Sequence, residues 1–232
     1  MRSTELNRLR ESIIRCRRCP RLVAFRRELA AERRRRHDTG LFWGRPVPGV
    51  GDPDPRLLVV GLAPGIQGSH RTGRMFTGDR SAAFLVRVLH RAGFANQPTS
   101  EHRDDGLAYR DLYLTAAVRC VPPDNRPTGA ERENCREYLE AEIRALPRLR
   151  SILCLGGFAW EAVRRAVGSV YGVPPPPVRF AHGAVLTLGP GRPTCYGSYH
   201  PSPQNTQTGR LTEPMLADLL QTIRNSWTTE TS

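Results

Sequence analysis

The stretch Leu57–Asp79 constrains the fold more than any other part of the chain. It begins with a short apolar run, Leu57–Gly61, whose two adjacent valines are typical of a buried strand. The run opens into a long segment rich in glycine and proline, and a helix is expected to begin near Asp79. Open α/β sheets bind ligands beyond the carboxyl ends of their strands. Because long loops without structure of their own are uncommon unless functional, the stretch predicts a ligand site in an α/β fold.

The residues around these glycines favour a polyanionic ligand. The glycines permit positive φ and close backbone approach, so that amides can surround a phosphate or a flat ring. Arg71, Arg74 and Arg80 lie within reach of the same segment. The segment lacks the Gly-Lys-[Ser/Thr] ending of a Walker loop and the glycine spacing of a dinucleotide fingerprint. We therefore expect no nucleotide cofactor.

The charge of the chain points to the same class of partner. The formal net charge is +13, which strongly favours an anionic partner such as nucleic acid. Every basic residue is arginine, so no lysine side chain is available to form a Schiff base. The sequence shows no signal peptide and no 18-residue apolar run, and we expect a cytoplasmic protein without membrane association. Its 232 residues fit one domain, 1–232.

The alternation of predicted strands and helices indicates an α/β fold, a three-layer α/β/α sandwich around a mostly parallel sheet. Strands are expected at Leu57–Gly61, Leu112–Val118 and Ser151–Leu155, with shorter β segments at Ala184–Leu188 and Thr194–Gly197. Two helices are expected in the N-terminal part, one over 4–15 and a very basic one that ends at about Arg36. Further helices are expected at Ser81–Ala92, Thr128–Leu146, Gly156–Val167 and from about Thr212. A proline-rich linker is expected at Val173–Val178. Thr128 and Glu131 form a capping box.

Four of the six cysteines suggest a metal site. Cys16 and Cys19 form a chelating Cys-x-x-Cys pair, Cys120 lies at a predicted strand end, and Cys135 lies in the following helix. Four thiolates could hold zinc or an iron–sulfur cluster, and spacing alone does not decide between them. The other two cysteines, Cys154 and Cys195, fall in β segments and are expected to be buried and inert.

With these residues in view, most of the chain resembles the uracil-DNA glycosylase superfamily, specifically its iron–sulfur-containing family 5 (B-type) enzymes. The motifs that carry the resemblance are Cys16-x-x-Cys19, Gly61-Leu62-Ala63-Pro64-Gly65, Gly73-Arg74-Met75-Phe76-Thr77-Gly78-Asp79, Arg119-Cys120-x-Pro122-Pro123-x-Asn125-Arg126, Cys135, and His200-Pro201-Ser202-Pro203-Gln204-Asn205. The resemblance implies a four-stranded parallel sheet and hydrolysis of the N-glycosidic bond. It also implies a [4Fe–4S] cluster on the four cysteines, which ties in the N-terminal helical segment (1–40).

The chemistry of base excision suggests a role for each candidate residue. Phe76 would stack on the flipped base, with a loop anchor in the core as the alternative. His200 would donate to a base oxygen as negative charge develops. Asp79 would orient water or stabilise the sugar cation, or would simply cap a helix. Asn125 would contact the base edge or the water. The backbone amides of Ala63 and Gly65 and the side chain of Arg210 would bind phosphates. Gln204 and Asn205 would fill the gap left by the flipped base.

Two positions depart from the pattern of the related family 4 enzymes. The family 4 relatives carry an acidic residue where this chain has Leu62 and an asparagine where it has Ala116. The resemblance therefore implies tolerance of other deaminated bases such as hypoxanthine. Because the chain has no lysine, we expect a monofunctional glycosylase that leaves an abasic site. We also expect it to act as a monomer and to be nucleoid-associated in a bacterium or archaeon. The alternative is an iron–sulfur or zinc protein that recognises uracil-containing DNA without excision.

Overall fold

The computed structural model describes residues 2–35, 40, 42–174 and 177–228. The expected end of the basic helix at Arg36 and part of the proline-rich linker lie outside these residues. The helices are α1 (Arg2–Arg15), α2 (Pro20–Arg35), α3 (Ser69–Thr72), α4 (Arg80–Arg91), α5 (Gly129–Ala145), α6 (Gly157–Tyr171), α7 (Pro203–Gln207) and α8 (Glu213–Ser226), with a 3₁₀ turn, η1, at Pro123–Asn125. The strands are β1 (Val50–Gly51), β2 (Leu57–Gly61), β3 (Leu112–Ala116), β4 (Ser151–Leu155), β5 (Val185–Leu186) and β6 (Thr194–Ser198).

One sheet runs through the molecule in the order β1-β3-β2-β4-β6-β5. Its four central strands are parallel, which confirms the expected parallel core. The sheet has six strands because the two-residue strands β1 and β5 add antiparallel edges to β3 and β6. The strands β1 and β5 form the two edges of the sheet. Because the four central strands are parallel, their carboxyl ends all lie at one end of the sheet.

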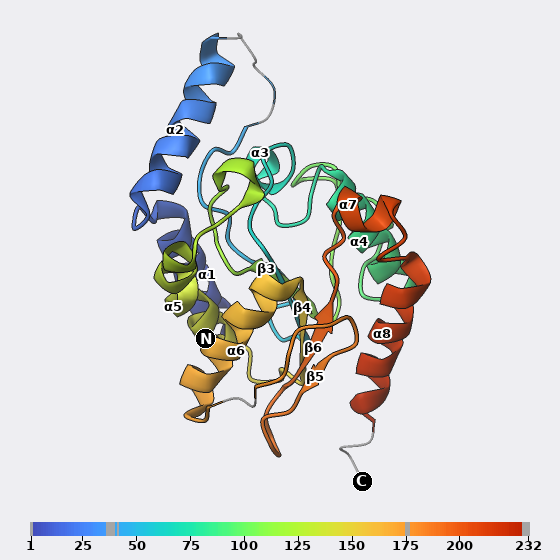
Figure 1. Cartoon of the computed structure of the whole chain (residues 1–232). Helices are drawn as coiled ribbons and strands as arrows, with labels where there is room; N and C mark the ends of the chain where they lie inside the picture. The colour runs from blue at the N-terminus through green and yellow to red at the C-terminus, as the bar shows by residue number, and fades with distance from the viewer. Residues whose placement is uncertain (1, 36–39, 41, 175–176, 229–232) are drawn as a thin grey trace.

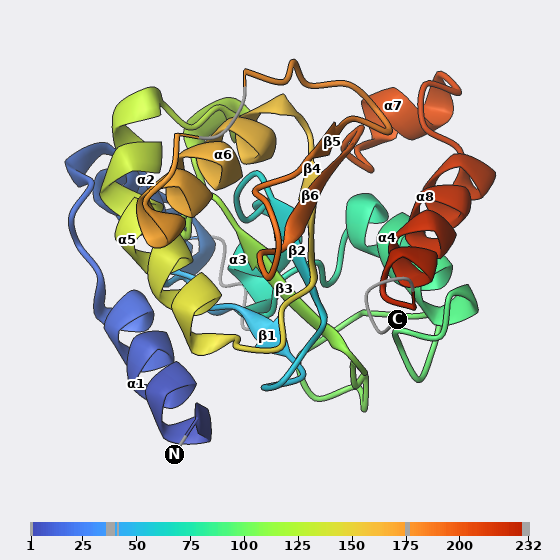
Figure 2. The same cartoon turned by 90° about the horizontal axis from the view of Figure 1, so that it is seen from below.

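Helices cover both faces of the sheet, as a three-layer sandwich requires (Figure 2). Alternate residues of each strand point to opposite faces, and the two sides build two separate cores. Leu58 and Ile152 belong to the core with α5 and α6, whereas Leu57 and Leu153 belong to the core with α4 and α8. The fully buried strand residues explain why the sequence reads as continuous apolar runs rather than as an alternating pattern.

The N-terminal helices pack differently from the rest. Helix α1 lies along α5 and buries Leu6 and Ile13. Helix α2 projects beyond the body of the molecule (Figure 1), and its buried residues near the base are Leu22 and Arg26. Beyond Arg26, the residues of this arginine-rich helix are partly or fully exposed. Within the described residues, no helix combines the length and the apolarity that crossing a membrane requires.

Local structure departs from expectation mainly in the loops that follow the strands. The glycine-rich segment contains the short helix α3, and the expected loop after β6 contains α7. Strand β3 ends at Ala116, two residues earlier than expected, and α6 continues to Tyr171. The amides of Ala117 and Val118 still donate to the carbonyls of Gly61 and Leu62, so the segment leaves the sheet still tied to β2.

Candidate active site

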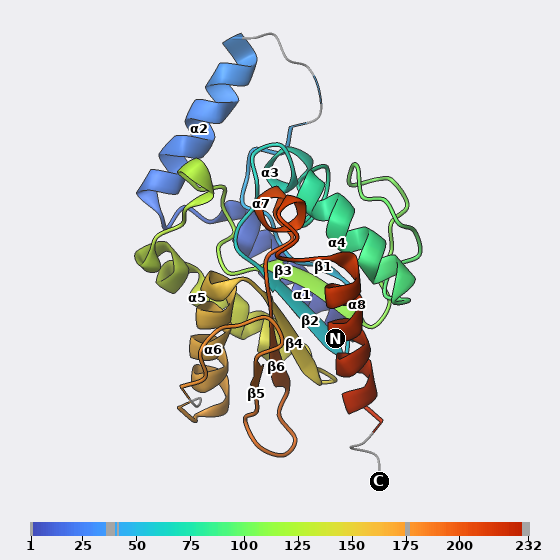
Figure 3. The ribbon, with the colours of Figure 1, turned by 45° about the vertical axis from the view of Figure 1, so that its right-hand side comes forward.

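A cleft of about 870 Å³ opens at the carboxyl end of the parallel strands. Helices α3, α4 and α7 surround this end of the sheet (Figure 3). The cleft joins segments that are far apart in the sequence, namely the glycine-rich segment, the turn after β3 and the loop after β6. The candidate residues that line it are Ala63, Gly65, Phe76, Asp79, Asn125, His200, Gln204 and Asn205. Leu62 and Ala116 line it as well, so these two positions offer it no charged group.

Phe76 serves both as a core residue and as a wall of the cleft. It is 8% exposed and belongs to the core between the sheet and α4. Its ring lies against Gly61, where an added Cβ would come within 2.7 Å of the ring. The ring centroid lies 6.4 Å from that of His200, with an angle of 33° between the planes. Phe76 and His200 thus form two neighbouring walls that are tilted relative to each other.

The backbone of Phe76 is held in a left-handed conformation by its surroundings. Its φ is 47°, which costs an L-residue about 1–2 kcal/mol. Its N–H donates to Ser69 Oγ at 3.0 Å and its carbonyl accepts from Ser100 Oγ at 2.9 Å. These two bonds join the segment to α3 and to the loop before β3.

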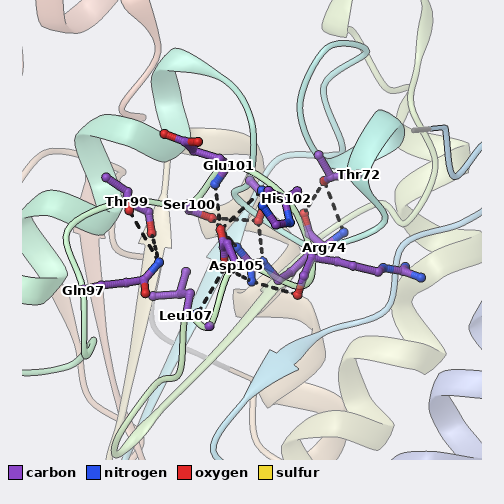
Figure 4. Close-up of polar contacts among 12 residues, drawn as sticks. Thr72, Arg74, Gln97, Thr99, Ser100, Glu101, His102, Asp105 and Leu107 are labelled. Carbon is purple, nitrogen blue, oxygen red and sulfur yellow. Dashed lines mark hydrogen bonds and ion pairs between the residues drawn. The ribbon is translucent and has the colours of Figure 1, made fainter. Parts of the chain in front are cut away.

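Arg74 is the centre of the network that fixes this segment (Figure 4). Its guanidinium makes a bidentate pair with Asp105, each N···O distance being 2.7 Å, and also donates to Thr77 and Ser100. Burial opposes ionisation of Asp105, but the hydrogen bonds from Arg74 and from backbone amides hold its pKa well below its usual range. Arg74 is 6% exposed, and the expectation that it faces an anionic ligand is therefore wrong. It positions the segment instead.

Asp79 caps a helix, the simpler of its two expected roles, and its position also leaves it in the lining of the cleft. Its Oδ1 accepts from the amide of Ala82 at 2.9 Å, which makes it the N-cap of α4, and the residue also lines the cleft. Burial raises the pKa of its carboxyl, opposed by the α4 amides and by Arg71. The other carboxylate oxygen, Asp79 Oδ2, lies close to Gly68: a Cβ atom added to Gly68 would be 1.9 Å from it. Gly68 therefore sets the position of the carboxylate, a role that the sequence reasoning missed.

His200 is neutral at physiological pH. Burial lowers its pKa to about 4. The loop that carries it is held by Asn205, whose side-chain amide donates to the His200 carbonyl at 2.8 Å. Asn205 therefore supports the histidine, in addition to lining the cleft. A neutral imidazole retains one N–H donor, which suits it to binding an oxygen that becomes anionic.

Asn125 reaches the cleft from a strained turn. Asp124 and Asn125 have φ values of 53° and 54°, two consecutive residues other than glycine in the left-handed region. The amide of Arg126 closes the turn on the carbonyl of Pro123 at 2.9 Å. Such backbone persists where its surroundings determine it, and it concentrates at functional sites.

Arg210 and Gln204 lie farther out. Arg210 is exposed, and its guanidinium stacks over the ring of Tyr199 at 4.6 Å, beside the residues that line the cleft. Gln204 is exposed at the start of α7 and lines the cleft at the same time. Gln204 therefore lies at the exposed rim of the cleft, and Arg210 lies outside its lining, beside Tyr199.

The four candidate metal-ligating cysteines come together between the base of α2 and the start of α5. Cys19, Cys120 and Cys135 share one buried cluster with Leu22 and Val118. The Cys120 thiol is close enough to Cys135, Cys16 and Cys19 to interact with all three electrostatically. Burial raises the pKa of the free Cys120 thiol to about 12 and that of the Cys135 thiol to about 11, so these two thiols are poorly ionised. By contrast, Cys154 and Cys195 are buried in the sheet, as expected.

The donor set of four thiols suits a soft metal ion or an iron–sulfur cluster. Among the described residues, no three or more His, Cys, Asp or Glu side chains are grouped so as to hold a metal ion. Hydrogen-bond donors do reach the sulfurs: Asn134 Nδ2 lies 3.5 Å from Cys19 Sγ, and the backbone amide of Arg119 bonds to Cys135. Donors of this kind accompany the thiolates of iron–sulfur clusters.

The comparisons with known proteins agree on one class. The profile of the family described as "Uracil DNA glycosylase superfamily" matches residues 48–224. The chain therefore belongs to the uracil DNA glycosylase superfamily. It is 51% identical over 207 residues to the type-5 uracil-DNA glycosylase of Mycobacterium tuberculosis, covering 89% of this chain and 76% of that protein. It is 48% identical over 210 residues to the type-5 enzyme of Thermus thermophilus, covering 90% and 93%. Against the type-5 enzyme of Pyrobaculum aerophilum it is 46% identical over 209 residues, covering 90% and 88%.

Proposed function

We propose that the cleft of this DNA-repair uracil-DNA glycosylase takes up one flipped-out base and hydrolyses its N-glycosidic bond, leaving an abasic site. The observation that carries the proposal is the convergence on one cleft of Phe76 and Asp79 from the glycine-rich segment, Asn125 from the turn after β3 and His200 from the loop after β6. A base inside a duplex cannot be reached, so the nucleotide must leave the stack at a cost of a few kcal/mol. Stacking on an aromatic ring returns about 1–3 kcal/mol per base, and Phe76 offers that ring.

Bond cleavage needs two opposite charges to be stabilised. As the base leaves, its oxygens gain negative charge, and the neutral His200 donates a hydrogen bond to one of them. The sugar gains positive charge, which the carboxylate of Asp79 stabilises while it orients the attacking water. The raised pKa of Asp79 makes this carboxylate a better proton acceptor than an exposed one. Asn125 contacts the base edge or the same water.

Contacts to the DNA strand surround this centre. The amides near Ala63 and Gly65 and the guanidinium of Arg210 take up phosphates, and Gln204 and Asn205 occupy the gap that the flipped base leaves. The net charge of +13 makes binding depend strongly on salt concentration. The enzyme works as a monomer on chromosomal DNA in the cytoplasm, as befits a repair enzyme whose relatives come from bacteria and an archaeon.

The apolar positions of the cleft broaden its choice of base. Leu62 and Ala116 supply no side-chain group that would match the polar edge of uracil. A pocket with fewer polar groups facing the base discriminates less between bases of similar shape. Hypoxanthine and other deaminated bases are therefore further substrates of the same cleft.

Cys16, Cys19, Cys120 and Cys135 would hold a [4Fe–4S] cluster, with a zinc ion as the less suitable occupant. When bound, the cluster supplies structural cross-linking rather than reaction chemistry. The cysteines themselves connect α2 and α5 to the segment after β3 that carries Asn125. The N-terminal segment 1–40 is thereby part of a single domain, 1–232.

A duplex oligonucleotide with one uracil tests the proposal. After incubation with the protein, alkali should cleave the strand at the uracil, and cleavage should be lost in His200→Ala and in Asp79→Ala. Tight binding without cleavage, by a preparation with the visible absorbance of an intact cluster, would favour a protein that recognises uracil-containing DNA without excision.

A further inference from the structure

We propose that Arg21, which lies outside the cleft, is a positioning residue that holds the Asn125 turn in its active conformation. The inference rests on the proposed function, because it assigns Arg21 an effect on the excision step. Arg21 stands two residues beyond Cys19 at the start of α2. Its side chain crosses to a segment more than a hundred residues away in the sequence.

Arg21 makes contacts of two kinds with that segment. Nε and Nη2 donate to the two carboxylate oxygens of Glu131 at 2.8 Å each. Nη2 also donates to the carbonyl of Arg126 at 3.1 Å, the residue that directly follows Asn125. The guanidinium fork allows both contacts at once, which a lysine ammonium would not reproduce.

Glu131 is itself fixed at the start of α5. Its side chain is 6% exposed, and Oε2 also accepts from the amide of Thr128 at 2.8 Å within the capping box. The partner that holds Arg21 is therefore part of a rigid helix end. Arg21 transmits that rigidity to the carbonyl of Arg126.

The turn needs such support because of its conformation. Asp124 and Asn125 both have positive φ, and the turn is closed by the amide of Arg126 bonding to Pro123. The bond from Arg21 fixes the opposite side of the same residue, its carbonyl. With Arg126 held on both sides, the two left-handed residues stay in place and Asn125 keeps facing the cleft.

Arg18 provides a matched control. It also belongs to the segment next to Cys19 and also pairs with a glutamate of α5, Glu137, at 2.6 Å. Its other contacts are the carbonyl of Asn134 and the ring of Tyr138, both on α5 rather than on the turn. Arg18→Gln therefore removes the same charge and the same type of ion pair without releasing the turn.

The test is a single-turnover measurement of uracil excision with enzyme in excess, so that weaker DNA binding does not affect the rate. Arg21→Gln and Arg21→Lys should each lower the rate about tenfold, since small misplacements of a reacting group are costly. Arg18→Gln should stay within twofold of the wild type. All three should keep the visible absorbance of the cluster.

A double-mutant cycle identifies the route of the effect. If Arg21 acts through Asn125, Arg21→Gln should cost little further rate in an Asn125→Ala background. Equal losses in both backgrounds, an Arg21→Gln rate within twofold of the wild type, or a rate that falls only in proportion to lost cluster absorbance would each overturn the inference. A wild-type protein that does not excise uracil would instead refute the proposed function, which separates the two failures.

Discussion

Gly68→Ala should damage catalysis although residue 68 carries no reactive group. The added Cβ would lie 1.9 Å from Asp79 Oδ2 and 2.6 Å from Asp79 Cγ. To regain an ordinary contact of 3.4 Å, the carboxylate must move by roughly 1.5 Å. A misplacement of about 1 Å in an active site can cost roughly 10²-fold in rate. We therefore expect the single-turnover rate of uracil excision to fall about a hundredfold.

The same substitution should weaken the start of α4. Moving the carboxylate disturbs the 2.9 Å bond from the Ala82 amide, and the loss of an N-cap costs about 1 kcal/mol. Asp79→Asn separates the two effects, because asparagine is also a good N-cap but carries no charge. It should lose activity to a similar degree and keep more stability than Gly68→Ala in thermal unfolding.

Gly129→Ala is the matched control for the added methyl group. Nothing lies within 4 Å of a Cβ at Gly129, so this variant should excise uracil at the wild-type rate. The reasoning would be refuted if Gly68→Ala stayed within threefold of the wild type while Asp79→Asn lost a hundredfold. In that case the charge of Asp79 would matter and its position would not.

Three further outcomes are expected. Cys120→Ser should lose the visible absorbance of the cluster and unfold at a lower temperature than Cys154→Ser, whose cysteine lies in β4. A Cys120→Ser protein that is stable, colourless and fully active would contradict the structural role of the four-cysteine site. Burial, with a smaller effect from Arg26, lowers the pKa of His70 from 6.5 to about 4. As the pH drops from 6.5 towards 4, the unfolded chain therefore binds a proton at His70 that the folded protein does not, and the free energy of unfolding falls. This loss amounts to about 3 kcal/mol, and His70→Leu should flatten that part of the stability–pH curve in denaturant titrations; an unchanged slope would contradict it. Finally, borohydride should trap no covalent DNA adduct and purified protein should not nick abasic DNA, because the chain lacks lysine; a trapped adduct would show a lyase step.

The sequence predicted best what depends on local pattern. The apolar runs at Leu57–Gly61 and Ser151–Leu155 became central strands with the expected limits, since buried parallel strands need continuous apolar residues. The capping box of Thr128 and Glu131 is present as well, because it needs only four consecutive residues. The motifs that carry the family resemblance also identified residues that line one cleft, whereas Arg210 lies outside that lining.

What the sequence did not reveal depends on partners that are distant in the chain. Arg74 looked like an anion-binding residue because its partner, Asp105, is 31 residues away. Gly68 looked like one glycine among several, and only the folded structure shows that it makes room for the Asp79 carboxylate. Arg21 lay in an arginine-rich stretch where no local pattern distinguishes it from its neighbours. In each case tertiary contact, rather than propensity, decides the role.

The two short edge strands of the sheet affect how easily another copy of the chain can add to it. A long exposed edge presents a row of unpaired backbone groups onto which another chain can add. Here β1 and β5 end the sheet with two residues each, and both run against the direction of the central strands. A neighbouring copy therefore finds little backbone to extend the sheet. Copies of this protein that lie close together are therefore poorly suited to join sheet edge to sheet edge.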